Sequence, residues 1–522
     1  MRLLLLLLIV LHIRSVCGSE FESHRIHGIH RLSFFHYRNS TVTPQSSRPR
    51  RHVENDECDD GGMFQTYYQQ QPVDHFNAND KRTYLQRYHI RRKYFNPMAT
   101  QSENIILVIG GEGEIGISMV CNDHMLPLRL ARENKALLVQ IEHRAFGKSR
   151  LLDDLSVESL QYLTSDQALA DLAHFIRMFI KHQRLRNPKI VAYGASYPGL
   201  LSARMRVVYP TYTQGNVASS APLMPSIDFY EYSQVVENAI YETDRECHQL
   251  IQDIFDEFLR ELKTPEGLKR LNRDVHFKPP IDPFNRSAQD LAYVAFGMYD
   301  TFQSIVQTNY VAGARSENGQ SKTIEGLCLV LKNPRVTNRM RKLSDAYLLS
   351  VGSDRSFATS YAKAIRILSR TSYDSKLADL RAWMWICCNE LGFFQTTNPR
   401  GIFKNAVLPS YHLRQCHDMF QGYFTPKLVA KKIRTTALKF GDPEDYPGTN
   451  VVFVHGSFDP WHPLGVFIND PQRRVTSIIT PKASHCADAA APYRNEPPQL
   501  NRTRQRISSK VRFFFSLKSS LY

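Results

Sequence analysis

The sequence predicts an α/β protein, with a largely parallel sheet, helices around it and a long helical insertion. Short, nearly continuous apolar runs rich in β-branched residues are typical of strands buried on both faces of a parallel sheet. Such runs occur at 104–109, 136–141, 189–193, 216–218, 449–454 and 475–479. Helical spacing fills 165–182 and 197–209 between them, and this alternation of strand and helix indicates the α/β class.

The segment from 228 to 430 differs from the rest of the chain, because it has few strand-like runs. Helical patterning covers 230–262, 288–311 and 343–368. An all-helical insertion between two strands of the sheet is the simplest account. We therefore expect a split α/β domain, 61–227 and 431–522, that carries a helical cap formed by 228–430.

The first residues predict entry into the secretory pathway. Met1-Arg2 is a short basic start, residues 3–11 are an unbroken apolar run, and small residues near Gly18 offer a cleavage point. The apolar run is too short to span a bilayer, so we interpret 1–18 as a cleaved signal peptide. No later run reaches the length of a spanning helix. We expect a secreted or lysosomal protein without a membrane span.

Residues 19–60 are expected to form a basic leader. Within it, Arg48-Pro49-Arg50-Arg51 resembles a cleavage site for basic-specific convertases. Cleavage there would make the segment a propeptide that ends at Arg51. The alternative is an exposed polar tail, and the sequence does not decide between the two.

Cysteines and glycosylation sequons agree with an oxidising compartment. The cysteines that remain after removal of the signal peptide are Cys58, Cys121, Cys247, Cys328, Cys387, Cys388, Cys416 and Cys486. An even number suits disulfide bonding, although one sequence does not give the pairing. Sequons that would carry N-linked glycans stand at Asn39, Asn285 and Asn501.

The formal net charge of +16 raises the question of nucleic-acid binding, which other features argue against. Part of the excess lies in the two tails, and no zinc-finger spacing, RNA-recognition signature or basic zipper accompanies it. A solvated basic surface is the better interpretation, and attachment to a polyanion is the alternative. His24, His27, His30 and His36 lack the Cys or carboxylate companions of a metal site, so no metal is expected.

A nucleophile elbow is predicted at Ser196. Gly194-Ala195-Ser196-Tyr197-Pro198 follows a predicted strand and precedes a predicted helix. Such a junction presents a serine hydroxyl on a sharp turn, next to the free N–H groups of a helix N-terminus. Pro198 replaces the usual glycine. A proline is tolerated in a first helical turn because its missing N–H would be unpaired there anyway.

The candidates for the acid and base that would serve Ser196 are Asp459 and His485. A serine hydroxyl needs a base to take its proton, and the base needs a carboxylate to fix its tautomer. Asp459 follows the predicted strand 449–454 and His485 follows 475–479, in the order serine, acid, histidine that this kind of fold requires. Asp488 is the second choice for the acid. A triad of this type needs no cofactor.

Two backbone amides are candidates for binding the oxyanion that forms when a serine attacks a carbonyl. One donor is expected from Tyr197, the residue after the nucleophile, and the other from the loop after an early strand. The run Gly110-Gly111-Glu112-Gly113 ends the strand 104–109. Gly111 therefore suits the second role.

Beyond these residues, the chain resembles the family of lysosomal prolyl carboxypeptidase, dipeptidyl peptidase II and thymus-specific serine protease. The matching motifs are 74–77, 86–88, 110–113, 142–149, 162–169, the serine elbow, Trp383, Cys388, Glu390, 394–396, 459–462 and 484–488. The last two look closest to the thymus-specific branch and its invertebrate relatives. The chain departs from the family pattern at Pro198, His455, Ile386 and Glu114.

The resemblance implies an α/β-hydrolase fold with a large helical cap inserted between the nucleophile and the acid. It also implies a serine-type exopeptidase that forms an acyl-enzyme on Ser196. Better-known members cut after proline, as dipeptidyl peptidases or carboxypeptidases, and this sequence does not choose between those directions. The candidate substrate contacts within the shared motifs are Glu112, Trp383, Glu390 and Trp461. Glu390 would meet a charged substrate terminus, or else be a surface carboxylate.

Two other functions remain open from the sequence. A catalytically inactive secreted family member that acts by binding is supported by Pro198 and Ile386 alone. An esterase or lipase of the same fold is opposed by the peptidase-like motifs outside the triad. Peptide substrates are the expected partners, and a homodimer is one assembly that the sequence allows without fixing it.

Overall fold

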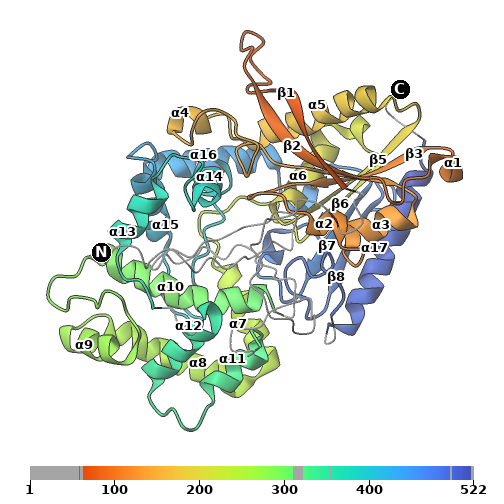
Figure 1. The fold of residues 1–522 in the computed structure, drawn as a ribbon. Coiled ribbons are helices and arrows are strands. Elements are labelled where there is room, and N and C mark those ends of the chain that lie inside the picture. Colours follow the sequence, from red (N-terminus) through yellow and green to blue (C-terminus); the bar gives the residue numbers. More distant parts are fainter. Residues whose placement is uncertain (1–57, 59–62, 310–320, 353–355, 494–495, 519–522) are drawn as a thin grey trace, which may run out of the picture.

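The computed structural model describes residues 58, 63–309, 321–352, 356–493 and 496–518 (Figure 1). The predicted signal peptide, almost all of the predicted leader and Asn39 therefore lie outside the described residues. Within the described ranges, no helix combines the length and the apolar character that crossing a membrane demands.

An eight-stranded sheet forms the centre of the molecule, in the order β1-β2-β4-β3-β5-β6-β7-β8. Its strands are β1 (Met63–Pro72), β2 (Thr83–Arg91), β3 (Glu103–Ile109), β4 (Leu137–Ile141), β5 (Pro188–Ala195), β6 (Gly215–Ser219), β7 (Val451–Gly456) and β8 (Val475–Thr480). Neighbouring strands from β4 to β8 run parallel, whereas β1 and β2 pair antiparallel, and so do β2 and β4. With its surrounding helices, this is the α/β-hydrolase fold that was predicted.

All six predicted strands are present, together with β1 and β2, which no apolar run in the sequence predicts. Strands β3, β4, β5, β6 and β7 are buried throughout or nearly so, as their apolar runs predict, whereas the edge strand β8 is only partly buried. Strand β2 instead mixes polar and apolar side chains, with its first residues alternating between exposed and buried. β1 is similarly rich in glutamine and tyrosine. An apolar-run criterion does not detect strands of this kind.

Helices cover both faces of the sheet. The helices that belong to the sheet domain are α1 (Pro97–Thr100), α2 (Ser118–Cys121), α3 (Leu126–Glu133), α4 (Val157–Leu160), α5 (Ser165–Gln183), α6 (Tyr197–Val208) and α17 (Pro498–Ser516). Along β3, Leu107 and Ile109 belong to the core shared with α5 and α6, while Ile106 and Val108 belong to the core shared with α3 and α17. Successive side chains of a strand point to opposite faces, so each face receives its own apolar layer.

The helical cap comes between β6 and β7, as the long insertion predicted. Its helices are α7 (Glu231–Thr243), α8 (Arg245–Glu261), α9 (Pro265–Asp274), α10 (Ala288–Gln307), α11 (Ile324–Leu331), α12 (Arg339–Val351), α13 (Tyr361–Leu368), α14 (Ala378–Ile386), α15 (Pro409–Met419) and α16 (Pro426–Phe440). A π-helical segment, η2 (Cys387–Leu391), continues α14. In Figure 1 these helices gather beside the sheet.

Two of the predicted cap helices are each divided into two in the structure. The stretch 230–262 breaks at Asp244, whose side chain accepts a hydrogen bond from Cys247 N and so caps α8. The stretch 343–368 is divided between α12 and α13. Helical periodicity continues across such breaks, whereas an N-cap aspartate marks a new helix start.

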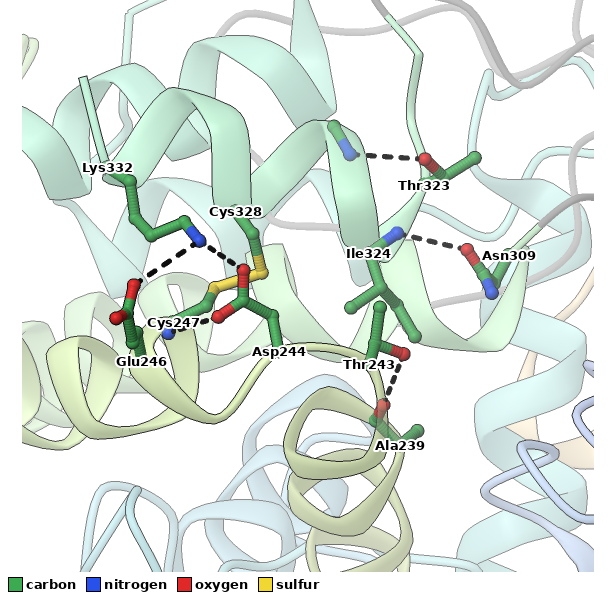
Figure 2. Close-up of a disulfide and its surroundings, with 11 residues drawn as sticks. Ala239, Thr243, Asp244, Glu246, Cys247, Asn309, Thr323, Ile324, Cys328 and Lys332 are labelled. Atoms are coloured by element: carbon green, nitrogen blue, oxygen red, sulfur yellow. Dashed lines mark hydrogen bonds and ion pairs between the residues drawn. A yellow bond between two sulfur atoms is a disulfide. The ribbon is translucent and has the colours of Figure 1, made fainter.

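Two disulfides join segments within the described part of the cap. Cys247 of α8 bonds to Cys328 of α11, and Lys332 lies beside this bond with ion pairs to Asp244 and Glu246 (Figure 2). A second disulfide joins Cys388 of η2 to Cys416 of α15. Both bonds link helices whose cysteines are distant in sequence, which restricts the unfolded chain.

A third disulfide joins Cys58 to Cys121 of α2. Cys58 falls in the segment that the sequence analysis placed in the leader, yet it is buried and covalently fixed to the sheet domain. Cys387, by contrast, carries a free thiol in the core. The even number of cysteines therefore does not mean that every thiol is paired.

Candidate active site

Ser196 occupies the sharp turn between β5 and α6. Its backbone has φ 65° and ψ −131°, and residues other than glycine rarely adopt a positive φ of this kind. Ser196 N donates to Ser219 O at 2.9 Å, which ties the turn to β6. A Cβ on Gly194 would lie 2.0 Å from Pro198 O, so only glycine fits this close approach. The local geometry is that of the predicted elbow.

His485 and Asp459 complete a chain of hydrogen bonds that starts at Ser196. His485 Nε2 lies 2.9 Å from Ser196 Oγ, and His485 Nδ1 lies 2.6 Å from Asp459 Oδ1. The histidine and aspartate are fully buried, and Ser196 is 7% exposed. Asp459 lies in the loop after β7 and His485 in the loop after β8, at the carboxyl ends of neighbouring parallel strands. The three side chains thus meet at one edge of the sheet.

The environment of Asp459 favours its carboxylate form. Burial alone would raise the pKa of Asp459, but the facing His485 and the hydrogen bonds that the carboxylate accepts lower the pKa below its ordinary value. One of those bonds comes from Trp461 N, at 3.0 Å from Oδ1. A charged, fixed carboxylate can hold the imidazole with Nδ1 protonated and Nε2 free to accept a proton.

Asp488, the second choice for the acid, lies in a different contact network. Its Oδ1 accepts a hydrogen bond from Ser219 Oγ at 2.5 Å, and Oδ2 lies 3.4 Å from the Tyr193 hydroxyl. Burial raises the pKa of Asp488. Asp459, and not Asp488, therefore contacts His485.

The predicted oxyanion donors lie next to each other. A Cβ on Gly111 would come within 2.5 Å of Pro198 Cγ, which places the Gly111 backbone directly against the first turn of α6. Among the described residues, neither the Gly111 amide nor the Tyr197 amide donates a turn, loop or cap hydrogen bond. Pro198 itself lies in that first turn, where a missing N–H costs nothing. Both amides therefore stay candidates for binding an oxyanion.

The two tryptophans among the candidate substrate contacts lie around the triad. Trp383 of α14 packs edge-on against the Tyr197 ring, with centroids 5.4 Å apart. Trp461 lies 6.2 Å from the His485 ring, and it also packs against Phe229 and Phe393. Aromatic side chains thus form apolar walls close to the reacting groups.

Glu112 and Glu390 are both buried carboxyls, with exposed fractions of 5% and 9%. Burial raises the pKa of each to about 7. Burial chiefly, and the nearby Glu390 and Glu112 carboxyls in addition, raise the pKa of the Tyr197 hydroxyl. Glu112 Oε2 has no hydrogen-bond partner among the described residues. Two buried acidic groups therefore lie near enough to Tyr197, the residue after Ser196, to act on its hydroxyl.

Glu390 is not the surface carboxylate that one interpretation expected. Its Oε2 accepts hydrogen bonds from Ser165 N at 2.8 Å and from Ser165 Oγ at 2.6 Å. Ser165 begins α5, so the Glu390 carboxyl from the cap lies at a helix N-terminus, where the hydrogen bonds from Ser165 lower its pKa by less than burial raises it. It joins the cap to the sheet domain.

Replacing Glu390 by glutamine should raise stability at pH 8 relative to the wild-type protein. A carboxyl whose pKa rises from 4.5 to about 7 on folding stabilises the native state below pH 4.5, and this contribution is lost as the pH rises through about 7. Glutamine has no such loss and keeps an oxygen for Ser165. The free energies of unfolding of variant and wild type, from urea titrations, should diverge by on the order of 3 kcal/mol between pH 5 and pH 8. A difference that does not change with pH would contradict this prediction.

One residue that contacts the triad loops is not predicted from the sequence. Gln307, at the end of α10, accepts hydrogen bonds from Trp461 Nε1 at 3.0 Å and from the His485 amide at 3.3 Å. No sequence motif indicates this role, because a glutamine in a helical stretch looks like an ordinary polar residue.

No three His, Cys, Asp or Glu side chains gather as a metal site would require, within the ranges that the structure covers.

Comparison with known proteins agrees with this geometry. The family described as serine carboxypeptidase S28 matches residues 71–507. A serine protease of Caenorhabditis elegans is 32% identical over 481 residues, covering 89% of this chain and 88% of that protein. The thymus-specific serine protease of mouse is 30% identical over 459 residues, with 85% and 86% covered. The human lysosomal Pro-X carboxypeptidase is 28% identical over 436 residues, with 81% and 82% covered.

The matches to the relatives extend over most of each chain, and the family match over 71–507 spans the elbow, the two loops and the cap. The fold, the serine–histidine–aspartate contacts and the relatives all agree on one class of protein. The chain therefore belongs to the serine carboxypeptidase S28 family and is a serine peptidase.

Proposed function

We propose that the protein is a serine exopeptidase that removes one or two residues from the end of a peptide, with a preference for proline at the cleaved bond. Ser196 is the nucleophile, His485 the base and Asp459 the acid that orients it. The observation that carries the proposal is the continuous chain from Ser196 Oγ through His485 to Asp459, at 2.9 and 2.6 Å. Pro198 and Ile386, which would favour an inactive protein, do not interrupt these contacts.

Acylation follows from the positions of the three side chains. His485 Nε2 takes the Ser196 proton as Oγ attacks the substrate carbonyl carbon, and Asp459 stabilises the imidazolium that forms. The Gly111 and Tyr197 amides donate hydrogen bonds to the carbonyl oxygen as it gains negative charge. The imidazolium then gives its proton to the leaving amine, and the peptide bond breaks to leave an ester on Ser196.

Deacylation repeats these steps with water. His485 removes a proton from a water molecule that attacks the ester carbonyl, and the same two amides bind the oxyanion. The imidazolium returns its proton to Ser196 Oγ as the acid product departs. Each cycle therefore consumes one water molecule and restores the starting enzyme without a cofactor.

Restricted access to Ser196 supports cleavage near the ends of peptide chains. Ser196 is only 7% exposed, and Trp383, Glu390 and Gln307, all from the cap, lie around the elbow and the triad loops. A cap that covers the nucleophile in this way leaves room for the end of a peptide chain and excludes folded polypeptide. An aromatic wall at Trp461 suits the flat, apolar ring of proline, and one relative is named a Pro-X carboxypeptidase.

We also propose that the protein works in the lysosome or outside the cell. Three disulfides among described residues fit an oxidising route of synthesis, and one relative is named as lysosomal. The sequon residues Asn285 and Asn501 are exposed, so both can accept a glycan. The signal peptide proposed for 1–18 would direct the chain there.

Product analysis tests the exopeptidase proposal. Short proline-containing peptides should lose one or two residues from an end, whereas a reduced, denatured protein should yield no internal fragments. Mass spectrometry over a time course distinguishes the two patterns, and parallel sets with an acetylated N-terminus or an amidated C-terminus identify the end that is used. The Ser196→Ala protein, purified identically, controls for contaminating peptidases. Rapid release of internal fragments from the denatured protein would overturn the proposal.

A further inference from the structure

The loop that carries His485 is held by the end of a cap helix. His485 N donates to Gln307 O at 3.3 Å, and the neighbouring Ser484 Oγ donates to Asn309 O at 2.6 Å. All four residues are buried. A loop after a strand has no ladder to fix it, so these two bonds to the cap are part of what sets the position of the imidazole.

The same glutamine holds the loop that carries Asp459. Trp461 N donates to Asp459 Oδ1 at 3.0 Å, so the placement of the Trp461 backbone helps to orient the carboxylate. The Trp461 side chain is anchored in turn, because its Nε1 donates to Gln307 Oε1 at 3.0 Å. The hydroxyl of Tyr232, in α7, donates to the same oxygen. Gln307 thus contacts the acid loop through its side chain and the base loop through its backbone.

We propose that Gln307 is a positioning residue for the triad, and that the cap helps to set the distance between His485 and Asp459. The inference rests on the proposed function, because it assumes that Ser196, His485 and Asp459 perform the reaction. In this view the cap has a second role besides covering the site. The two loops also bond to each other directly, at Phe458 N and Ala483 O, and α10 adds a contact that both loops share.

The consequences for catalysis follow from geometry. The two hydrogen bonds of the triad, at 2.9 and 2.6 Å, are near their best lengths, and hydrogen bonds weaken steeply when they lengthen or tilt. A misplacement of about 1 Å can cost about 100-fold in rate. Loss of the Gln307 oxygen would leave buried N–H and O–H donors on Trp461 and Tyr232 without their acceptor, and the acid loop would shift to satisfy them.

Gln307→Met removes the side-chain acceptor and keeps similar length and volume, whereas Gln307→Glu keeps an oxygen and serves as the conservative rescue. A matched control comes from the same helix one turn earlier. Gln303 is also buried, but its Nε2 bonds to Gln395 Oε1 at 2.8 Å, inside the cap. Gln303→Met therefore removes hydrogen bonds to Gln395 and Asp300, both within the cap, and leaves the contacts of Gln307 in place.

The readout is the rate at which a small fluorophosphonate modifies Ser196, because this probe needs the triad and makes little use of a peptide site. We expect Gln307→Met to lower the second-order labelling rate between about 10- and 100-fold, and to shift its pH profile. Gln303→Met should leave both within about twofold of wild type, and Gln307→Glu should recover most of the rate at acidic pH. A Gln307→Met protein that labels at the wild-type rate while KM for peptides rises would overturn the inference and leave the cap as a cover only.

A second variant keeps the test open if Gln307→Met does not fold. Trp461→Phe removes the Nε1 donor and keeps an aromatic ring, so it breaks the same bond from the other side. The labelling rate should fall again, and combining Trp461→Phe with Gln307→Met should cost less than the product of the single effects. An unchanged rate in Trp461→Phe, or fully multiplicative effects, would count against the inference. Wild-type protein that does not label at Ser196 would instead refute the proposed function itself.

Discussion

Replacing Ser196 by alanine is expected to lower turnover by about 10⁶-fold, the scale seen when the nucleophile of a triad is deleted. The change removes the hydroxyl that His485 Nε2 contacts at 2.9 Å, so no ester can form. The fold should survive, because alanine fits the same turn and the Ser196 N–H bond to Ser219 O comes from the backbone. The measurement is kcat on short proline-containing peptides, after confirming matched thermal unfolding of the two proteins.

Other serines near the site offer no substitute nucleophile. Ser149 Oγ donates to Glu142, Ser202 Oγ to Val217 O and Ser219 Oγ to Asp488. Ser220 Oγ accepts from Cys486 N. Because none of these bonds involves His485, the alanine variant should keep only the residual rate that binding and the oxyanion amides supply. Equal activity in variant and wild type would show that another residue is the nucleophile.

Replacing Asp459 by asparagine should lower turnover by about 10⁴-fold with the fold intact. Asp459 Oδ1 accepts from both His485 Nδ1 and Trp461 N, at 2.6 and 3.0 Å. An asparagine can present its amide nitrogen to His485, which then holds the proton on Nε2 and cannot accept one from Ser196. The loss should appear in kcat, measured where wild-type activity is highest.

Asp488→Asn is the control for this variant. Asp488 bonds to Ser219 Oγ and lies near the Tyr193 hydroxyl, so the change should affect stability more than turnover. Thermal unfolding and kcat of the two asparagine variants separate these effects. If Asp488→Asn were the inactive protein and Asp459→Asn remained active, the assignment of the acid would be wrong.

The elbow could be predicted because all of its determinants are local. A buried strand, the turn around Ser196 and a helix with proline in its first turn occur within about twenty consecutive residues, and the structure has them in that form. The positions of Asp459 and His485 at one edge of the sheet could be predicted from their order along the chain and from the strands that precede them. The distances between them could not, since they depend on the register of β7 and β8 in the finished sheet.

Other features of the site depend on contacts that sequence patterns do not record. Gln307 meets Trp461 across a separation of 154 residues, and Glu390 meets Ser165 across 225. Neither pairing follows from periodicity or spacing, because each depends on how the cap packs against the sheet domain. For the same reason, the sequence alone could not show that Glu390 is buried and joins the cap to the sheet domain.

The central claim, that Ser196 is an activated nucleophile, is tested most directly by covalent labelling. Folded wild-type protein with its leader processed is treated with a fluorophosphonate, digested, and mapped by mass spectrometry. We predict a single modification on the peptide that contains Ser196, loss of peptidase activity in proportion to labelling, and no labelling of Ser196→Ala or of heat-unfolded protein. Folded wild-type protein that remains unmodified, or that is modified at another serine, would contradict the account.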